Sequence, residues 1–203
     1  EHSRGTVLYC HGNGGNISSF LELYRIFGDI GMDVFVFDYR GYGRSEGETS
    51  VEGTYRDVDG AWRYLAEVRK INPSSIVVWG RSMGGPVAAY CASRHQAGAF
   101  VAESTFTSLW DETGSACCVF PYIVWPVHEY ETIEYVRRIH SPVLVIHSID
   151  DEVVPFEMGR ELYSAAAEPK RFLEIRGSHN SGFFISRDYY IEGIKLFFKE
   201  NLK

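Results

Sequence analysis

The sequence IVVWGRSMGG, residues 76–85, joins a short apolar run to a glycine-rich turn. The run at residues 76–79 is continuous and rich in β-branched residues, which is typical of a strand buried on both faces of a parallel sheet. The stretch that follows, residues 83–95, predicts a helix. The turn between them therefore leads from a buried strand directly into a helix, and that is the building unit of an α/β fold.

The same alternation of short apolar runs and longer amphipathic stretches extends along the chain. Strands alternating with helices favour an open α/β sheet, mostly parallel, with helices on both faces. Ligands bind such sheets at the carboxyl ends of the strands, so the residues just after each run are the ones to examine. The last run is more polar and is expected near an edge. The further strands are predicted at residues 7–10, 34–37, 99–102, 143–146 and 171–175, and the further helices at residues 18–30, 51–71, 155–167 and 186–202.

The length of 203 residues favours a single domain over residues 1–203. One segment, at about residues 105–140, departs from the alternation, because it is rich in aromatic side chains and is interrupted by Pro121 and Pro126. We expect this segment to be a short cap insertion over one end of the sheet. It supplies four candidate pocket residues, Phe106, Trp110, Phe120 and Trp125; packing of these aromatics on the sheet is an equally good interpretation.

Composition excludes several classes of protein. The chain has 20 basic and 27 acidic residues, a net charge of -7, and this argues against nucleic acid as a partner. It has no apolar run of the ~18 residues that a membrane helix needs. No cysteine pair has zinc-ligand spacing, so we expect free thiols, a reducing compartment and a cytoplasmic or cytoplasmic-facing location. The cysteines are Cys10, Cys91, Cys117 and Cys118.

Residues 80–84 fit the pattern G-x-S-x-G between a strand and a helix, which is the context that a nucleophilic serine requires. A sharp strand-to-helix turn strains the serine backbone, so its neighbours must be small. The hydroxyl of Ser82 would then project above the sheet, and the helix N-terminus behind it would favour developing negative charge. We therefore predict Ser82 as a nucleophile rather than as a capping serine in a glycine-rich turn.

A serine nucleophile needs a base, and the base needs an orienting acid. His179 follows the sixth run and so lies at the correct end of the sheet, after the acid in chain order. The acid is expected after the fifth run, where Asp150, Asp151 and Glu152 all stand. Glu103, after the fourth run, is a fallback whose alternative role is to anchor a loop.

Acyl transfer also needs two N–H donors for the oxyanion. The residue after the nucleophile, Met83, supplies one. The glycine-rich loop at residues 11–16 follows the first strand and supplies the second, for which we choose the N–H of Asn13. A phosphate-binding loop is the rival interpretation, but no lysine follows at the spacing it requires. No metal or organic cofactor is needed for this chemistry.

Together these stretches resemble the α/β-hydrolase superfamily, and within it the Bem46-like group that includes the ABHD17-type depalmitoylases. The resemblance implies that Asp151 is the acid, because the family's acid stands directly before an E-x-V-P stretch. It also implies that residues 39–47 form a structural loop near the pocket. The matching stretches are HGNGGN at 11–16, DYRGYGRSEG at 38–47, GRSMGG at 80–85, ESTFTS at 103–108, DEVVPFEMG at 151–159 and SHN at 178–180.

The chain departs from the family at its beginning. The family usually has additional strands before the HGN loop, often behind an N-terminal membrane segment, and here the chain starts almost at that loop. We expect the N-terminal strands to be missing or reduced, and a membrane contact to be made through a missing segment if at all.

The predicted function is a serine hydrolase that cleaves carboxylic ester or thioester bonds of a small-molecule or acyl substrate. Two alternatives remain at this point. One is a hydrolase-fold protein used for binding or signalling with little turnover, and the other is a peptidase of the same superfamily.

Overall fold

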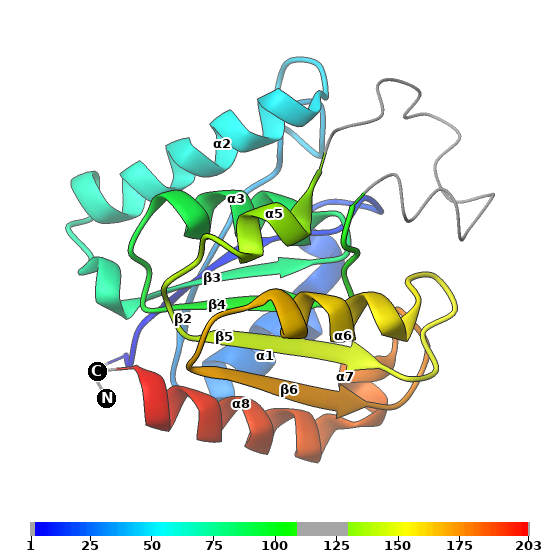
Figure 1. The fold of residues 1–203 in the computed structure, drawn as a ribbon. Coiled ribbons are helices and arrows are strands. Elements are labelled where there is room, and N and C mark those ends of the chain that lie inside the picture. The colour runs from blue at the N-terminus through cyan, green and yellow to red at the C-terminus, as the bar shows by residue number, and fades with distance from the viewer. Residues whose placement is uncertain (1–2, 109–129, 203) are drawn as a thin grey trace.

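The computed structural model describes residues 3–108 and 130–202, and within them six strands form one parallel sheet (Figure 1). The strand order is β2-β1-β3-β4-β5-β6. Every neighbouring pair of strands is parallel, so the carboxyl ends of all six strands lie at the same end of the sheet. The strands are β1 (Thr6–Cys10), β2 (Asp33–Val36), β3 (Ile76–Arg81), β4 (Ala99–Glu103), β5 (Val143–Ser148) and β6 (Lys170–Ile175).

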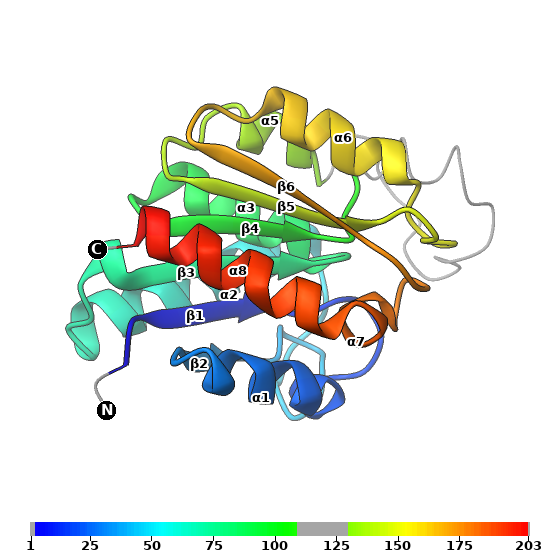
Figure 2. The ribbon, with the colours of Figure 1, turned by 90° about the horizontal axis from the view of Figure 1, so that it is seen from below.

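Helices cover both faces of the sheet, as the alternation predicts (Figure 2). One face carries α2 (Val51–Arg63), α3 (Gly84–Arg94), α5 (Thr132–Val136) and α6 (Phe156–Ala165). The other carries α1 (Leu21–Asp29) and α8 (Arg187–Asn201), preceded by the single-turn α7 (Gly182–Ile185). Two apolar clusters, one on each face, bury alternate residues of the same strands. The four central strands, β1, β3, β4 and β5, are thus buried on both faces, which explains their continuous apolar runs.

The predicted elements are confirmed, with small differences at their ends. β3 extends two residues beyond the apolar run, through Arg81, because this part of the sheet is buried between β1 and β4. The predicted helix 51–71 is divided, since α2 ends at Arg63 and a π-helical turn continues over Tyr64–Val68. Short 3-10 turns occur at Ile17–Phe20 and Pro73–Ser75. The polar β6 is an edge strand, as expected.

The predicted cap insertion at 105–140 lies largely outside the described residues. Its described ends contain Phe106 and Tyr130, both buried, and α5, which packs between α3 and α6. In residues 3–108 and 130–202, no helix is long and apolar enough to cross a membrane. Cys10 and Cys91 are buried free thiols, and the cytoplasmic location stays a prediction.

Candidate active site

Ser82 occupies a strained turn between β3 and α3. Its φ is +53°, in the left-handed region that non-glycine residues rarely adopt. A Cβ at Gly80 would lie 2.3 Å from the carbonyl oxygen of Gly84, and a Cβ at Gly84 would lie 2.0 Å from that of Cys10. The two glycines of the motif are therefore required by close backbone packing on either side of the serine.

Backbone and side-chain hydrogen bonds hold this turn in place. The N–H of Ser82 donates to the carbonyl of Glu103 at 3.0 Å, and the hydroxyl of Thr105 donates to the carbonyl of Ser82 at 2.7 Å. The first loop packs on the other side, because a Cβ at Gly12 would come within 3.3 Å of the Cβ of Ser82. The N-terminus of α3 begins two residues after Ser82. The hydroxyl thus projects from a rigid support.

His179 and Asp151 form a hydrogen-bonded pair beside this turn. Nδ1 of His179 lies 2.9 Å and 3.0 Å from the two carboxylate oxygens of Asp151. The backbone N–H groups of Val153 and Val154 each donate to Oδ1 of Asp151 at 2.9 Å. Because the acidic partner accepts, Nδ1 carries the proton and Nε2 is left as the acceptor. This is the tautomer that a general base needs.

The pKa of Asp151 lies below its ordinary value of 3.8. Burial acts to raise this pKa, and it is outweighed by the hydrogen bond and the Coulombic interaction with His179 and by the N–H donors of Val154 and Val153. The pair is therefore built to keep the carboxylate ionised. Asp150, the rival acid, is exposed and instead pairs with Arg176 at 3.2 Å.

Two further residues of the β5 end support the pair, and sequence reasoning did not find either role. The carboxylate of Glu152 accepts the backbone N–H of His179 at 2.9 Å. His147 is fully buried, donates from Nε2 to the carbonyl of Val154 at 3.0 Å and lies 3.6 Å from Asp151. Burial lowers the pKa of His147 below its ordinary value of 6.5, which favours the neutral form of its ring. The position of His147 near the carboxyl end of β5 was the one sequence feature that pointed to a role at the site.

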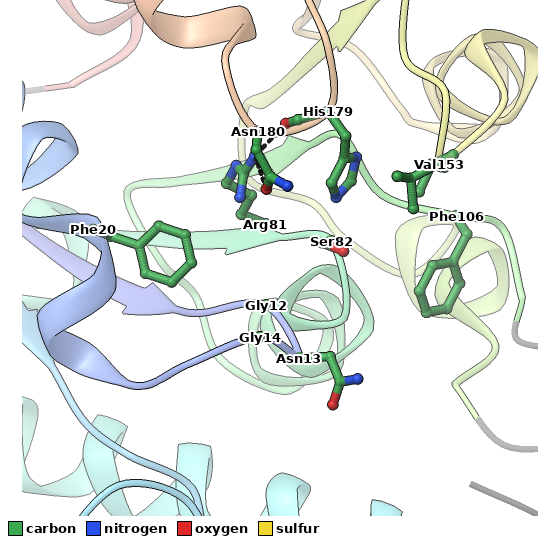
Figure 3. A pocket seen from close by; sticks show the side chains of 11 residues that line it. Gly12, Asn13, Gly14, Phe20, Arg81, Ser82, Phe106, Val153, His179 and Asn180 are labelled. Atoms are coloured by element: carbon green, nitrogen blue, oxygen red, sulfur yellow. Dashed lines mark hydrogen bonds between the residues drawn. The ribbon is translucent and has the colours of Figure 1, made fainter. Parts of the chain in front are cut away.

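Ser82 and His179 line one cavity of about 240 Å³, together with residues from the first loop and from the β5 end (Figure 3). The His179 ring and the Ser82 side chain face the same space in this view. Phe106, predicted as a pocket residue, is buried and lines it. Trp110, Phe120 and Trp125 lie outside the described residues. The lining residues are Gly12, Asn13, Gly14, Phe20, Arg81, Ser82, Phe106, Val153, Val154, His179 and Asn180.

The predicted oxyanion donors flank Ser82. Asn13 lines the cavity, and Met83 directly precedes α3. In the part of the chain that the structure describes, neither backbone N–H is engaged by an acceptor. The hydroxyl of Tyr42 donates to Oδ1 of Asn13 at 2.6 Å, and that of Tyr39 donates to the carbonyl of His11 at 3.0 Å. The loop at residues 39–47 therefore supports the first loop.

Arg81, which directly precedes Ser82, is buried. Its side chain is 3% exposed, and its Nη2 donates to the carbonyl of His179. Glu103, the fallback acid, lies 3.6 Å from Nε of Arg81 and is no partner of His179's ring. It accepts hydrogen bonds from Trp79 Nε1 at 2.8 Å and from the Tyr190 hydroxyl at 3.0 Å. The sequence pattern did not predict this cluster, because its four side chains come from β3, β4 and α8 and meet only in the folded core. They are Trp79, Arg81, Glu103 and Tyr190.

No group of three or more histidine, cysteine, aspartate or glutamate side chains within residues 3–108 and 130–202 is arranged to hold a metal ion.

Comparison with known proteins places these residues in a family. The family described as "Serine aminopeptidase, S33" matches residues 1–119. An uncharacterized protein of Mycobacterium tuberculosis is 34% identical over 96% of this chain and 69% of its own length. Alpha/beta hydrolase domain-containing protein 17B of Xenopus laevis is 30% identical over 97% of this chain and 67% of its own length. Alpha/beta hydrolase domain-containing protein 17C of Homo sapiens is 29% identical over 98% of this chain and 60% of its own length.

Solved structures share the fold. An esterase of Pyrococcus furiosus superimposes with a TM-score of 0.81 at 22% identity, over 99% of this chain and 84% of the esterase. A monoacylglycerol lipase of Paleococcus ferrophilus superimposes with a TM-score of 0.74 at 20% identity, over 98% of this chain and 96% of the lipase. The match to the family model and the identity to the 17B relative show that the chain belongs to the α/β-hydrolase superfamily, is ABHD17-like within it, and is a hydrolase.

Proposed function

We propose that this chain is a serine hydrolase that cleaves carboxylic ester or thioester bonds through Ser82, His179 and Asp151. The observation that carries the proposal is the bond from Nδ1 of His179 to the Asp151 carboxylate, at 2.9 Å, beside a serine held at a φ of +53°. That arrangement leaves Nε2 of His179 as an acceptor in the cavity where the hydroxyl of Ser82 projects.

The reaction runs through an acyl-enzyme. Nε2 of His179 takes the proton of Ser82 as its oxygen attacks the carbonyl carbon, and Asp151 stabilises the imidazolium that forms. The N–H groups of Asn13 and Met83 bind the tetrahedral oxyanion. The C–O or C–S bond then breaks, and the alcohol or thiol leaves with the proton from His179. Water, deprotonated by the same imidazole, attacks the acyl carbon; the bond to Ser82 then breaks, the imidazolium returns its proton to the Ser82 oxygen, and the acid is released.

The cavity supports an apolar acyl group as the substrate. Phe20, Phe106, Val153 and Val154 supply its apolar side chains, and Asn13 and Asn180 supply amides. Such a lining binds hydrocarbon by burial and orients it with few polar contacts. We therefore expect a small-molecule or acyl substrate, with no cofactor.

An aminopeptidase is the second candidate, since the matching family carries that description. Such an enzyme must bind the positively charged α-amine of its substrate. Among the described lining residues none is a carboxylate that could pair with such an amine. The lining thus favours an ester or thioester over a peptide N-terminus.

Hydrolysis of p-nitrophenyl esters from acetate to palmitate tests the proposal, with an acyl thioester and an aminoacyl p-nitroanilide measured in parallel. We expect Ser82→Ala to lower kcat by about 10⁴–10⁶-fold, because the three residues act as a unit. Unchanged turnover in a pure, folded Ser82→Ala protein would refute the nucleophile. Turnover of the anilide above both esters and thioester would favour the aminopeptidase.

A fluorophosphonate probe separates an enzyme from a binding protein of the same fold. We expect rapid covalent labelling of the wild type and none of Ser82→Ala. Absence of labelling and of turnover on every substrate would instead favour the binding or signalling role.

A further inference from the structure

Arg81 is a buried cation directly beside the candidate nucleophile. Its side chain is 3% exposed and extends from the last residue of β3 toward the loop after β6 (Figure 3). There Nη2 donates to the carbonyl of His179 and reaches Oδ1 of Asn180 at 3.5 Å. The guanidinium also lies over the ring of Phe20, 5.6 Å from its centroid. Arg81 therefore joins two chain segments that are far apart in the sequence.

The charge of Arg81 is compensated on its other side. Oε1 of Glu103 lies 3.6 Å from Nε, too long for a hydrogen bond but close enough for strong Coulombic attraction in a buried site. Oε2 of Glu103 is fixed by Trp79 and Tyr190. The carboxylate thus has one oxygen facing the arginine and one anchored in the core.

These contacts do not suit a site for an anionic substrate. The charge is balanced by Glu103, and the hydrogen bonds of Nη2 go to the His179 loop rather than to the cavity. A cation meant to bind substrate would present its donors there. The chemistry available to this arginine is to fix a backbone carbonyl.

We propose that Arg81 is a positioning residue for the base: its guanidinium fixes the backbone of His179 relative to Ser82, while Glu103 neutralises it. The inference rests on the proposed function, in which His179 must reach the Ser82 proton. Residues 81 and 82 are adjacent. The hydrogen bond from the Arg81 side chain to the His179 carbonyl therefore restrains the position of the base relative to the nucleophile. The Asp151 bond orients the ring, and the Arg81 bond places its backbone.

The test compares kcat and KM of Arg81→Met and Arg81→Lys on the preferred ester of the wild type. Misplacing a reacting group by about 1 Å costs about 10²-fold in rate, so we expect kcat of Arg81→Met to fall by about 10²-fold. KM should change by less than about 2-fold, because uniform substrate binding is untouched. Arg81→Lys keeps the charge and places its N–H donors on a single nitrogen, and we expect it to recover part of kcat.

Arg81→Met leaves the Glu103 carboxylate buried without its cation and could fail to fold. The double variant Arg81→Met/Glu103→Gln removes both charges and keeps the Trp79 and Tyr190 contacts. We expect it to be folded by thermal melting and still reduced in kcat. Wild-type kcat in this folded double variant, or a rise in KM that accounts for the whole loss, would overturn the positioning role.

Arg176→Met is the matched control. Arg176 directly follows β6 and forms an ion pair with Asp150, but its side chain is 67% exposed and it is not among the residues that line the cavity. We expect its kcat to equal that of the wild type. Ser82→Ala in the same series separates the two claims: serine-independent turnover overturns the proposed function, and with it this inference, whereas serine-dependent turnover unaffected by Arg81→Met overturns the inference alone.

Discussion

Glu103 and Asp151 are two buried carboxylates at the ends of neighbouring strands, β4 and β5, and their environments are opposite. The pKa of Glu103 is raised above its ordinary value of 4.5, and that of Asp151 is lowered below 3.8. Burial is the leading influence on both groups and acts upward on both. The difference between them lies in the donors that each carboxylate receives.

Asp151 accepts two backbone N–H bonds and shares both oxygens with Nδ1 of His179, all at 2.9–3.0 Å. Glu103 accepts from two neutral side chains, Trp79 and Tyr190, and its cation stands 3.6 Å away. Closely spaced donors, one of them able to become a cation, offset burial at Asp151 but not at Glu103. One carboxylate is arranged to stabilise a developing imidazolium, and the other to hold an arginine and the core.

Asp151→Asn should have the largest effect of any change to these two groups. An amide cannot stabilise the imidazolium and favours the wrong tautomer, so we expect kcat to fall by about 10⁴-fold, or about 5.5 kcal/mol in the barrier. Ester hydrolysis measures it. Asp150→Asn is the control, since Asp150 is exposed and should leave kcat within about 2-fold. A small loss of kcat in Asp151→Asn with a large loss in Asp150→Asn would show that Asp150, rather than Asp151, is the acid.

Glu103→Leu should act mainly on stability. It leaves Arg81 as a buried charge without its partner and removes the acceptor of Trp79 and Tyr190, so we expect unfolding to become easier by about 3–5 kcal/mol. Urea unfolding followed by fluorescence measures this. Glu103→Gln retains an acceptor and should lose less. Equal stability of wild type and Glu103→Leu would show that the pair contributes nothing to folding.

Stability should depend on pH in opposite ways at the two sites. At Asp151 the folded pKa is lowered, so its contribution is present above about 3.8 and is lost as pH falls through the folded value. At Glu103 the folded pKa is raised, so its contribution is present below about 4.5 and is lost as pH rises through the folded value.

Unfolding free energies of wild type, Asp151→Asn and Glu103→Gln between about pH 3 and about pH 7 measure these contributions, with slopes of at most about 1.4 kcal/mol per pH unit for one proton. As pH rises, the unfolding free energy of the wild type should increase relative to that of Asp151→Asn. Relative to that of Glu103→Gln it should decrease. Slopes of the same sign for both would remove the contrast between the sites.

Tyr190→Phe isolates one hydrogen bond of Glu103. The hydroxyl is buried and donates at 3.0 Å, and its loss should cost about 1 kcal/mol of stability. Because Trp79 still anchors the same oxygen, kcat should stay near the wild-type value. A loss of kcat without a loss of stability would show that Tyr190 acts on the site rather than on the core.

The smallest effect is expected from the exposed pair of Asp150 and Arg176, whose side chains are 47% and 67% exposed. Solvent screens such pairs, so Asp150→Asn should change stability by less than about 1 kcal/mol, as thermal melting can measure. A larger loss would point to the bond that Asp150 accepts from the N–H of Gly177.

The sequence was sufficient for the parts of this protein that depend on local chemistry. Continuous apolar runs predicted the six strands, and G-x-S-x-G between a strand and a helix predicted the turn at Ser82, because few residues other than glycine fit where backbone approaches so closely. Strand-end positions predicted that His179 and an acidic residue would meet. The choice of Asp151 over Asp150 needed the family resemblance, since the residues alone left both open.

Tertiary structure decided the contacts between side chains that no spacing rule connects. Arg81, Glu103 and Tyr190 come from β3, β4 and α8, and their meeting depends on strand order and on which helix covers that face. A pattern read along the chain shows an arginine beside a serine, and it carries no information on the burial of that arginine. The sequence by itself determined the strand-end residues of this protein, because those positions follow from local periodicity. The folded structure alone determined how they are held, because burial and pairing arise from long-range packing.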